Sequence, residues 1–161
     1  MKYLLLALFS FLAVIAQVIA GNGFFLFNFL DLSLILVAFW AIYRNRTQAL
    51  FVGSIAGLLQ DAVLGWPLGY NGFGKTLAAF LAGLAARHFN VEGAWIRAAL
   101  IAAASCVNVL SVFLLFLLLQ RNVGAIFLGA SLMQCLITGG VGSLAFAAYD
   151  GYSGTRFRKA G

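Results

Sequence analysis

Residues 69–76 read G-Y-N-G-F-G-K-T, and this spacing of glycines, lysine and threonine matches the phosphate-binding loop of nucleotide-binding enzymes. In those enzymes the loop follows a β-strand, begins a helix and works with a carboxylate that holds Mg²⁺. Here the apolar run 48–64 precedes the pattern, which indicates a membrane helix in place of the strand. We therefore interpret residues 69–76 as a glycine-rich hairpin between two helices and predict no nucleotide binding.

Asp61 and Lys75 are ionisable residues on the two sides of this hairpin. Asp61 follows Gln60 near the end of one apolar run, and Lys75 lies shortly after Asn71 in the next run. Because a tight turn joins the runs, they should be antiparallel neighbours with both charges at a similar depth. An ionisable group inside hydrocarbon costs at least about 2.5–3.5 kcal/mol, so it usually has a partner or a function. We predict an Asp61–Lys75 ion pair that pins the hairpin. The alternatives are that the two charges line a partner or ligand site, or that each reaches water separately.

The turn between these runs contains Gly65, Pro67 and Gly69, residue types that interrupt helices and form turns. Another acid, Asp31, stands immediately before the apolar run 32–43. At about 1.5 Å per residue, this run is too short to cross about 30 Å of hydrocarbon. We therefore expect a short or distorted second segment: either residues 24–28 also enter the membrane, or the run is a short helix shielded by its neighbours.

Few side chains could support catalysis or bind a metal ion: Asp31, Asp61, Glu92, Asp150, His88, Cys106 and Cys135. The first two acids can approach one face of the membrane, whereas the other two belong to the opposite face. The cysteines and the histidine are not at metal-ligand spacing. The sequence contains no Ser-His-Asp set or paired carboxylates. We expect no enzymatic activity, no metal and no cofactor.

Composition indicates an integral membrane protein. Of the 161 residues, 64% are hydrophobic and only 9% are charged. Soluble domains are about half apolar and about a quarter charged. The net charge of +6 comes from basic residues scattered between apolar runs, so they do not form the solvated patch that nucleic acid needs.

The apolar residues form runs at 3–20, 32–43, 48–64, about 72–86, 95–119 and about 125–149. They are continuously apolar and do not alternate, which predicts helices instead of the strands of a barrel. We expect an all-α protein with about six transmembrane helices in a compact bundle, forming one polytopic domain over residues 1–161. For run 3–20 we favour an uncleaved helix; the alternative is a signal peptide, because residues 18–20 read V-I-A.

Basic residues predict the orientation. With the N-terminus in the cytoplasm, eight of the ten are cytoplasmic: Lys2, Arg44, Arg46, Arg87, Arg97, Arg156, Arg158 and Lys159. Arg121 then faces outside, and Lys75 lies near the start of the fourth run. This distribution follows the positive-inside rule and places both termini in the cytoplasm.

Small residues recur at the spacing that lets membrane helices approach closely: Gly53 with Gly57, Ala16 with Ala20, and Ala79 with Gly83. We expect them to pack within the chain, with contact to another subunit as the alternative. The late runs also contain polar residues that can bond across helices: Ser105, Asn108, Ser111, Gln134 and Thr138.

The chain resembles the bacterial rod-shape-determining protein family MreD over nearly its whole length. Residues 57–61 read G-L-L-Q-D and residues 65–69 read G-W-P-L-G, followed by Asn71. These stretches are similar to the family's Gly-Leu-rich helix that ends in Asp and to its Pro-Leu-Gly turn. Asp31 before an apolar run resembles the family's Pro-Asp-Leu entry to its second segment, although Leu30 replaces the proline.

The resemblance implies a non-catalytic scaffold or regulatory subunit in the inner membrane, within the cell-elongation machinery that makes peptidoglycan. It implies MreC as the direct partner, with MreB, RodA and a class B penicillin-binding protein in the same complex. The family's fold is similar to that of the substrate-binding subunits of energy-coupling-factor vitamin transporters. Such a subunit is the alternative function, and it would need an outward pocket with convergent polar groups.

The expected partner-binding or structural residues lie around the outer hairpin and the second segment: Asp31, Gln60, Asp61, Gly65, Pro67, Gly69, Asn71 and Lys75.

Overall fold

A computed structural model describes residues 8, 11–17, 19, 30–89, 91, 93–119 and 126–153. The labelled helices of this part are α2 (Leu32–Tyr43), α3 (Arg46–Leu64), α4 (Tyr70–His88), α5 (Ala94–Leu118) and α6 (Ile126–Ser153). Residues 11–17 are helical as well. The predicted all-α membrane fold is confirmed. Predictions that concern residues 1–7, Ala20, Glu92, Arg121 and residues 154–161 lie outside the described residues.

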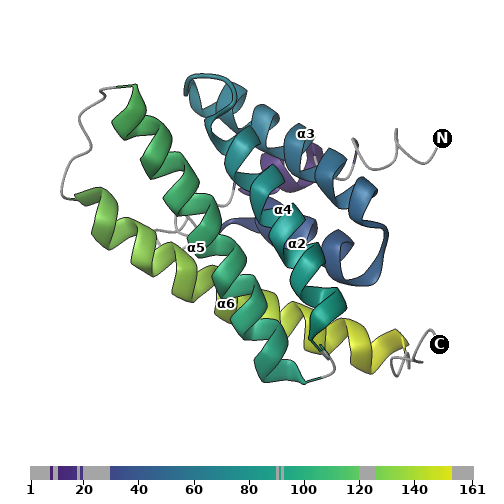
Figure 1. Cartoon of the computed structure of the whole chain (residues 1–161). Helices are drawn as coiled ribbons and strands as arrows, with labels where there is room; N and C mark the ends of the chain where they lie inside the picture. The colour runs from purple at the N-terminus through teal and green to yellow at the C-terminus, as the bar shows by residue number, and fades with distance from the viewer. Residues whose placement is uncertain are drawn as a thin grey trace.

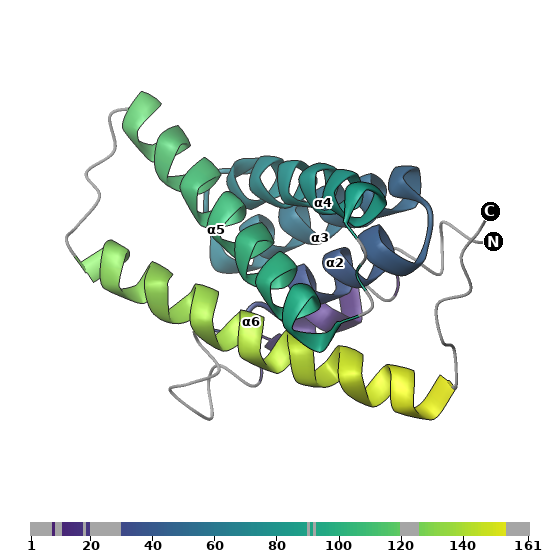
Figure 2. The same cartoon turned by 60° about the horizontal axis from the view of Figure 1, so that its bottom comes forward.

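The helices form two antiparallel pairs with α2 between them. The turn at residues 65–69 joins α3 to α4, and α4 packs against α2, α3 and α5. α5 and α6 form the second pair, and α6 also contacts α2. The order of the helices can be followed in Figure 1. Figure 2 shows α2 enclosed between the α3–α4 pair and α6.

The second segment is short, as predicted. α2 has 12 residues, so it is about 18 Å long, well below the about 30 Å of a hydrocarbon core. The side chain of Asp31 caps its first turn by accepting a hydrogen bond from the backbone N–H of Leu34, and the helix ends at Arg44. Half-length helices are tolerated in a membrane where neighbouring helices shield them, and α2 has such neighbours on several sides.

Three described helical stretches are long and apolar enough to cross a membrane: Arg46–Leu64, Trp95–Leu118 and Leu132–Tyr149. α4 has the same 19-residue length as α3, but it contains Asn71 and Lys75 and ends with Arg87 and His88. The predicted total of about six crossings remains a prediction.

Glycine and alanine let the helices approach closely. A Cβ on Gly53 would lie 2.8 Å from the carbonyl oxygen of Lys75, and one on Gly57 would lie 2.5 Å from the Cα of Gly72. These two glycines therefore pack α3 against the backbone of α4, as predicted. Ala79 is also buried in the core, whereas Ala16 is exposed.

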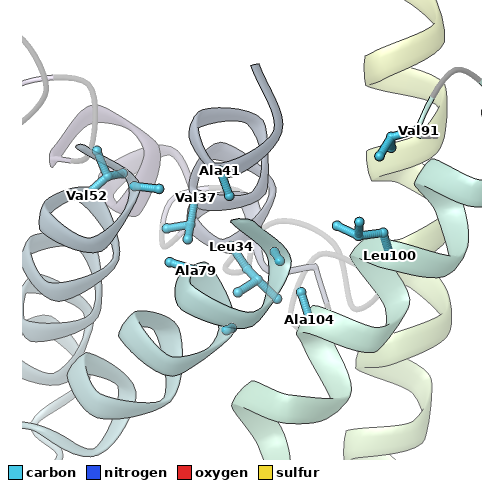
Figure 3. Packing of buried hydrophobic residues seen from close by; sticks show 11 residues of the cluster. Leu34, Val37, Ala41, Val52, Ala79, Val91, Leu100 and Ala104 are labelled. Carbon is cyan, nitrogen blue, oxygen red and sulfur yellow. The ribbon is translucent and has the colours of Figure 1, made fainter. Parts of the chain in front are cut away.

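The largest apolar cluster is built mainly from small side chains of α2, α3, α4 and α5 (Figure 3). Leu34 and Val37 of α2 meet Ala79 of α4 and Ala104 of α5 in this cluster. In lipid, helix association depends on close packing, because the acyl chains are as apolar as the side chains. The many alanines suit that requirement.

Basic side chains gather at one end of the helices. They lie after α2, at the start of α3, at the end of α4 and at the start of α5: Arg44, Arg46, Arg87, His88 and Arg97. We call this the basic end. The opposite end contains the turn at residues 65–69 and is called the turn end. This separation agrees with the charge distribution used for the orientation, which itself stays a prediction.

Candidate functional site

An ion pair lies at the centre of the bundle. The Nζ of Lys75 in α4 is 2.5 Å from Oδ1 and 2.6 Å from Oδ2 of Asp31, the residue that caps α2. The side chains are 0% and 1% exposed. A buried ion of either sign is costly unless it is paired and hydrogen-bonded. Each of these residues therefore needs the other.

Polar side chains from α2, α3 and α6 surround this pair. Ser33 donates its hydroxyl hydrogen to Asp31 Oδ1 at 2.7 Å and accepts a hydrogen bond from Lys75 Nζ. The Gln60 side-chain oxygen lies 3.4 Å from the same hydroxyl oxygen. From α6, the side-chain nitrogen of Gln134 lies 3.5 Å from Asp31 Oδ2.

The backbone at the start of α2 joins the same network. The N–H of Asp31 donates to the Thr138 hydroxyl at 3.1 Å, and the N–H of Leu34 donates to Asp31 Oδ1 at 2.9 Å. Asp31 thus connects the beginning of α2 to α4 through its carboxylate and to α6 through its backbone. The arrangement fixes the relative positions of three helices.

The predicted Asp61–Lys75 ion pair is wrong. Asp61 instead binds the start of α4: its Oδ2 accepts from the N–H of Gly69 at 2.9 Å and of Asn71 at 3.1 Å. The Asn71 side chain also donates to Asp61 Oδ1 at 2.8 Å. The N–H of Gly72 is 3.4 Å from Oδ2. Asp61 caps α4 from across the turn.

The physical reason lies in the first turn of α4. The first N–H groups of a helix have no partner within the helix, and they carry the positive end of its dipole. The carboxylate of Asp61 satisfies several of these groups at once. Lys75 lies on the same face of α4 as Asn71 but one turn further along, about 6 Å deeper. At that depth its neighbour is Asp31.

The turn itself takes the conformation that its glycines permit. Gly65 and Gly69 have φ values of 67° and 106°, a region that favours glycine. The N–H of Trp66 donates to the backbone oxygen of Asp61 at 2.9 Å. The rings of Trp66 and Tyr70 both contact Phe116 of α5 edge-on, with centroid distances of 5.7 and 4.9 Å. The turn is therefore fixed to its own helices and to α5.

This geometry explains the phosphate-loop pattern at residues 69–76. A phosphate loop binds its anion through backbone N–H groups at a helix start. Here the N–H groups of Gly69, Asn71 and Gly72 already bind the Asp61 carboxylate. Lys75, the residue that would contact a phosphate, is bound to Asp31 inside the bundle.

The structure brings together most of the residues predicted to matter, but in two groups. Asp31, Lys75 and Gln60 belong to the ion-pair network, whereas Asp61 and Asn71 belong to the turn with Gly65, Pro67 and Gly69. Sequence reasoning missed Ser33, and it expected Gln134 and Thr138 to bond across helices without identifying Asp31 as their partner. The available signal was their polarity inside apolar runs, since such residues usually bond to one another.

Within the described part of the chain, the other chemistry-bearing side chains form no comparable site. Among the described residues, no group of three His, Cys, Asp or Glu side chains could hold a metal ion. The sulfur atoms of Cys106 and Cys135 are 3.3 Å apart between α5 and α6, and both thiols are free. Asn108 of α5 lies against Gly74 of α4, where an added Cβ would be 2.5 Å from its side-chain oxygen.

An apolar groove of about 440 Å³ lies between α2 and α6. A second groove, of about 300 Å³, is lined by residues of α3 and α4, mostly leucine and phenylalanine. Neither has the convergent polar groups that bind a vitamin-like molecule. The polar side chains around Lys75, those of Asp31, Ser33 and Gln134 among them, are directed toward one another.

Comparison with known proteins identifies the family. No curated protein and no solved structure gives a significant match to the chain, so the predicted likeness to energy-coupling-factor subunits remains a prediction. The family model described as rod shape-determining protein MreD matches residues 1–139. The match includes both the ion pair and the turn. The chain therefore belongs to the MreD family of rod shape-determining membrane proteins.

Proposed function

We propose that the chain is a non-catalytic scaffold or regulatory subunit of the bacterial cell-elongation machinery. In this role it binds MreC and helps to position peptidoglycan synthesis, which maintains the rod shape. Membership of the MreD family supports the shape-determining part of the proposal. MreC is proposed as the partner because of the family resemblance, and the docking mode is supported by the form of the turn end.

The observation that carries the proposal is an apolar surface supported by a fixed turn. Leu68 is 71% exposed and Phe73 is 53% exposed, beside the exposed Leu64 and Trp66. We call these four residues the turn surface. Asp61 holds the backbone beneath them through the hydrogen bonds described above. A preorganised surface loses less entropy on binding, so more of the contact energy contributes to affinity.

The ion-pair network has a supporting role in this proposal. Asp31, Lys75 and Gln134 connect α2, α4 and α6 at one depth. Because α4 begins at the turn end, this connection sets the position of the turn surface relative to the rest of the bundle. The network acts through geometry, and MreC contacts the turn surface and the neighbouring helix faces.

The remaining parts of the proposal concern the assembly and its location. MreB, RodA and a class B penicillin-binding protein join through the complex with MreC. The protein lies in the cytoplasmic membrane with both termini in the cytoplasm. The basic end then faces the cytoplasm and its anionic lipids, and the turn surface faces the outside, where peptidoglycan is assembled.

Affinity purification of the tagged protein at native level in mild detergent, with mass spectrometry of proteins and small molecules, tests this function. We expect MreC and cell-wall synthases to be recovered. Recovery of a coupling subunit with paired ATPases, or of a stoichiometric vitamin, would contradict the scaffold function and support the transporter alternative.

A matched pair of variants locates the docking surface. Leu68 and Leu144 are both 71% exposed, the first on the turn surface and the second on α6. Leu68→Ala should lower the recovery of MreC, whereas Leu144→Ala should leave it unchanged. Equal recovery with both variants would exclude the turn surface as the docking site.

A further inference from the structure

The apolar groove between α2 and α6 has a composition and a position that suit a lipid. Its volume is about 440 Å³, within the about 300–1,000 Å³ of typical small-molecule sites. The lining comes from α2, where it includes Phe39, from Ala145, Phe146 and Tyr149 of α6, and from Ala13 of the helical residues 11–17. Nearly all of this surface is hydrocarbon, so its occupant must be apolar along the length of the groove.

The groove follows one face of α2. Leu32, Leu36 and Trp40 are four residues apart and therefore lie along the same side of the helix. From the first to the last, this side extends for about 12 Å. A single acyl chain can lie along this side of α2 within the groove.

One end of the groove adjoins aromatic and basic side chains. Phe39, Tyr43 and Tyr149 contact one another, with ring centroids 4.9 to 5.4 Å apart. The hydroxyl of Tyr43 accepts a hydrogen bond from Arg97 at 2.9 Å. Arg44 follows directly and is exposed. This end of the groove is therefore part of the basic end, where positive charge and aromatic rings meet as they do at a membrane interface.

Among the described residues, the other end of the groove offers no comparable charge. It begins at Leu32, next to Asp31, whose carboxylate is bound to Lys75 and hydrogen-bonded within the bundle. An occupant that is charged at one end and apolar at the other would match this polarity. Its charged end should be negative, because the basic end is positive.

We propose that the groove binds one acyl chain of an anionic phospholipid, taken from the membrane leaflet that faces the basic end. The acyl chain lies along α2 from Trp40 to Leu32. The phosphate group lies beside Arg44 and the Tyr43–Arg97 pair. The lipid covers the exposed apolar side of α2, and it holds α6 beside α2.

Native mass spectrometry of the purified full chain tests this site. The protein is exchanged into detergent with phosphatidylglycerol or, separately, with phosphatidylcholine, and the retained lipids are counted. We expect one phosphatidylglycerol molecule to be retained in preference to phosphatidylcholine. Absence of a retained lipid, or equal retention of the two lipids, would overturn the proposal.

Variants on α6 separate this groove from general lipid contact. Ala145 lines the groove, whereas Ala148 is exposed on α6 and does not line it. Ala145→Trp should abolish retention of the lipid. The Ala148→Trp variant should retain as much lipid as the unmodified chain. Circular dichroism and elution volume check that each variant is folded. If Ala145→Trp is not folded, Leu36→Trp fills the groove from α2 instead.

Charge variants test the position of the phosphate group. Arg44→Gln should lower the preference for the anionic lipid roughly fivefold, the equivalent of about 1 kcal/mol for one basic residue near the surface. Arg87→Gln, at the same end but on α4, should change this preference much less.

Unchanged lipid retention in Ala145→Trp would overturn the proposal, because it would show that lipids bind elsewhere. Recovery of a second copy of the chain or of a partner helix, released by filling the groove, would assign it to a protein contact.

Discussion

Lys75 Nζ lies 2.5 Å from Asp31 Oδ1, although the two residues are 44 positions apart in the sequence. Both are inside a bundle whose outer surface is mostly leucine, phenylalanine and alanine. A pair of this kind stabilises little compared with an apolar replacement of both residues, but the loss of one partner leaves an unpaired ion. Its main contribution is to make one arrangement of α2 and α4 much more favourable than others.

Removal of one partner of this pair should destabilise the protein more than removal of both. Asp31→Asn and Lys75→Met should each lower the free energy of unfolding by about 3–5 kcal/mol, because each leaves a buried charge without its partner. The double variant should be more stable than either single variant, because it leaves no unpaired charge. Denaturant unfolding in detergent measures the difference, with the exposed Arg87→Met as a control. Additive losses would contradict the pair.

Asp61 and Lys75 should behave almost independently. Asp61→Ala removes the cap of α4 and should cost about 0.5–2 kcal/mol, the usual range for a lost helix cap, or more because the site is buried. A double-mutant cycle of Asp61→Ala with Lys75→Met should show a smaller coupling energy than the Asp31–Lys75 cycle. If the coupling energy of Asp61 with Lys75 is larger than that of Asp31 with Lys75, the result would support the ion pair predicted from the sequence.

Gly57 should not tolerate a side chain, whereas Gly140 should. A Cβ on Gly57 would lie 2.5 Å from backbone atoms of α4, and nothing lies within 4 Å of one on Gly140. Gly57→Ala should cost about 1–3 kcal/mol through overpacking, and Gly140→Ala should be neutral or stabilise the helix by up to about 1 kcal/mol. Thermal unfolding in detergent compares the two variants. Similar midpoints would exclude the close approach of α3 and α4.

Single cysteines placed at the basic end and at the turn end should react with a maleimide from opposite sides of the membrane. In a background with Cys106→Ser and Cys135→Ser, Leu68→Cys should react with an impermeant maleimide in intact spheroplasts. Arg87→Cys, also exposed, should react only after permeabilisation. The opposite result would reverse the orientation inferred from the basic residues.

The helix boundaries were largely predictable because local signals mark them. Asp31 and Arg44 flank α2, and the predicted run 32–43 coincides with the observed helix. Gly65 and Pro67 likewise mark the end of α3. In lipid a polar residue at the end of an apolar run is a strong boundary signal, since its transfer into hydrocarbon is costly.

The pairing of the buried charges was not predictable from the same signals. Sequence spacing gave the depth of Lys75 but not the order of helices around α4, so the acid nearest in sequence was chosen over Asp31. The polar residues of α6 are more than 100 positions from Asp31. Only three-dimensional packing brings them together. Gln60 and Asn71 were placed in the region because Gln60 adjoins Asp61 and Asn71 lies about one helical turn before Lys75.

The order of synthesis gives the Asp31–Lys75 pair a further consequence. Asp31 leaves the ribosome before Lys75, so the counter-ion of the lysine is already available when α4 enters the bilayer. Asp61 likewise precedes the amide groups of the turn that it binds. Lys75 and the backbone amide groups at the start of α4 therefore find their partners in an earlier part of the chain. Gln134 and Thr138 arrive last and close the network after the charges are already paired.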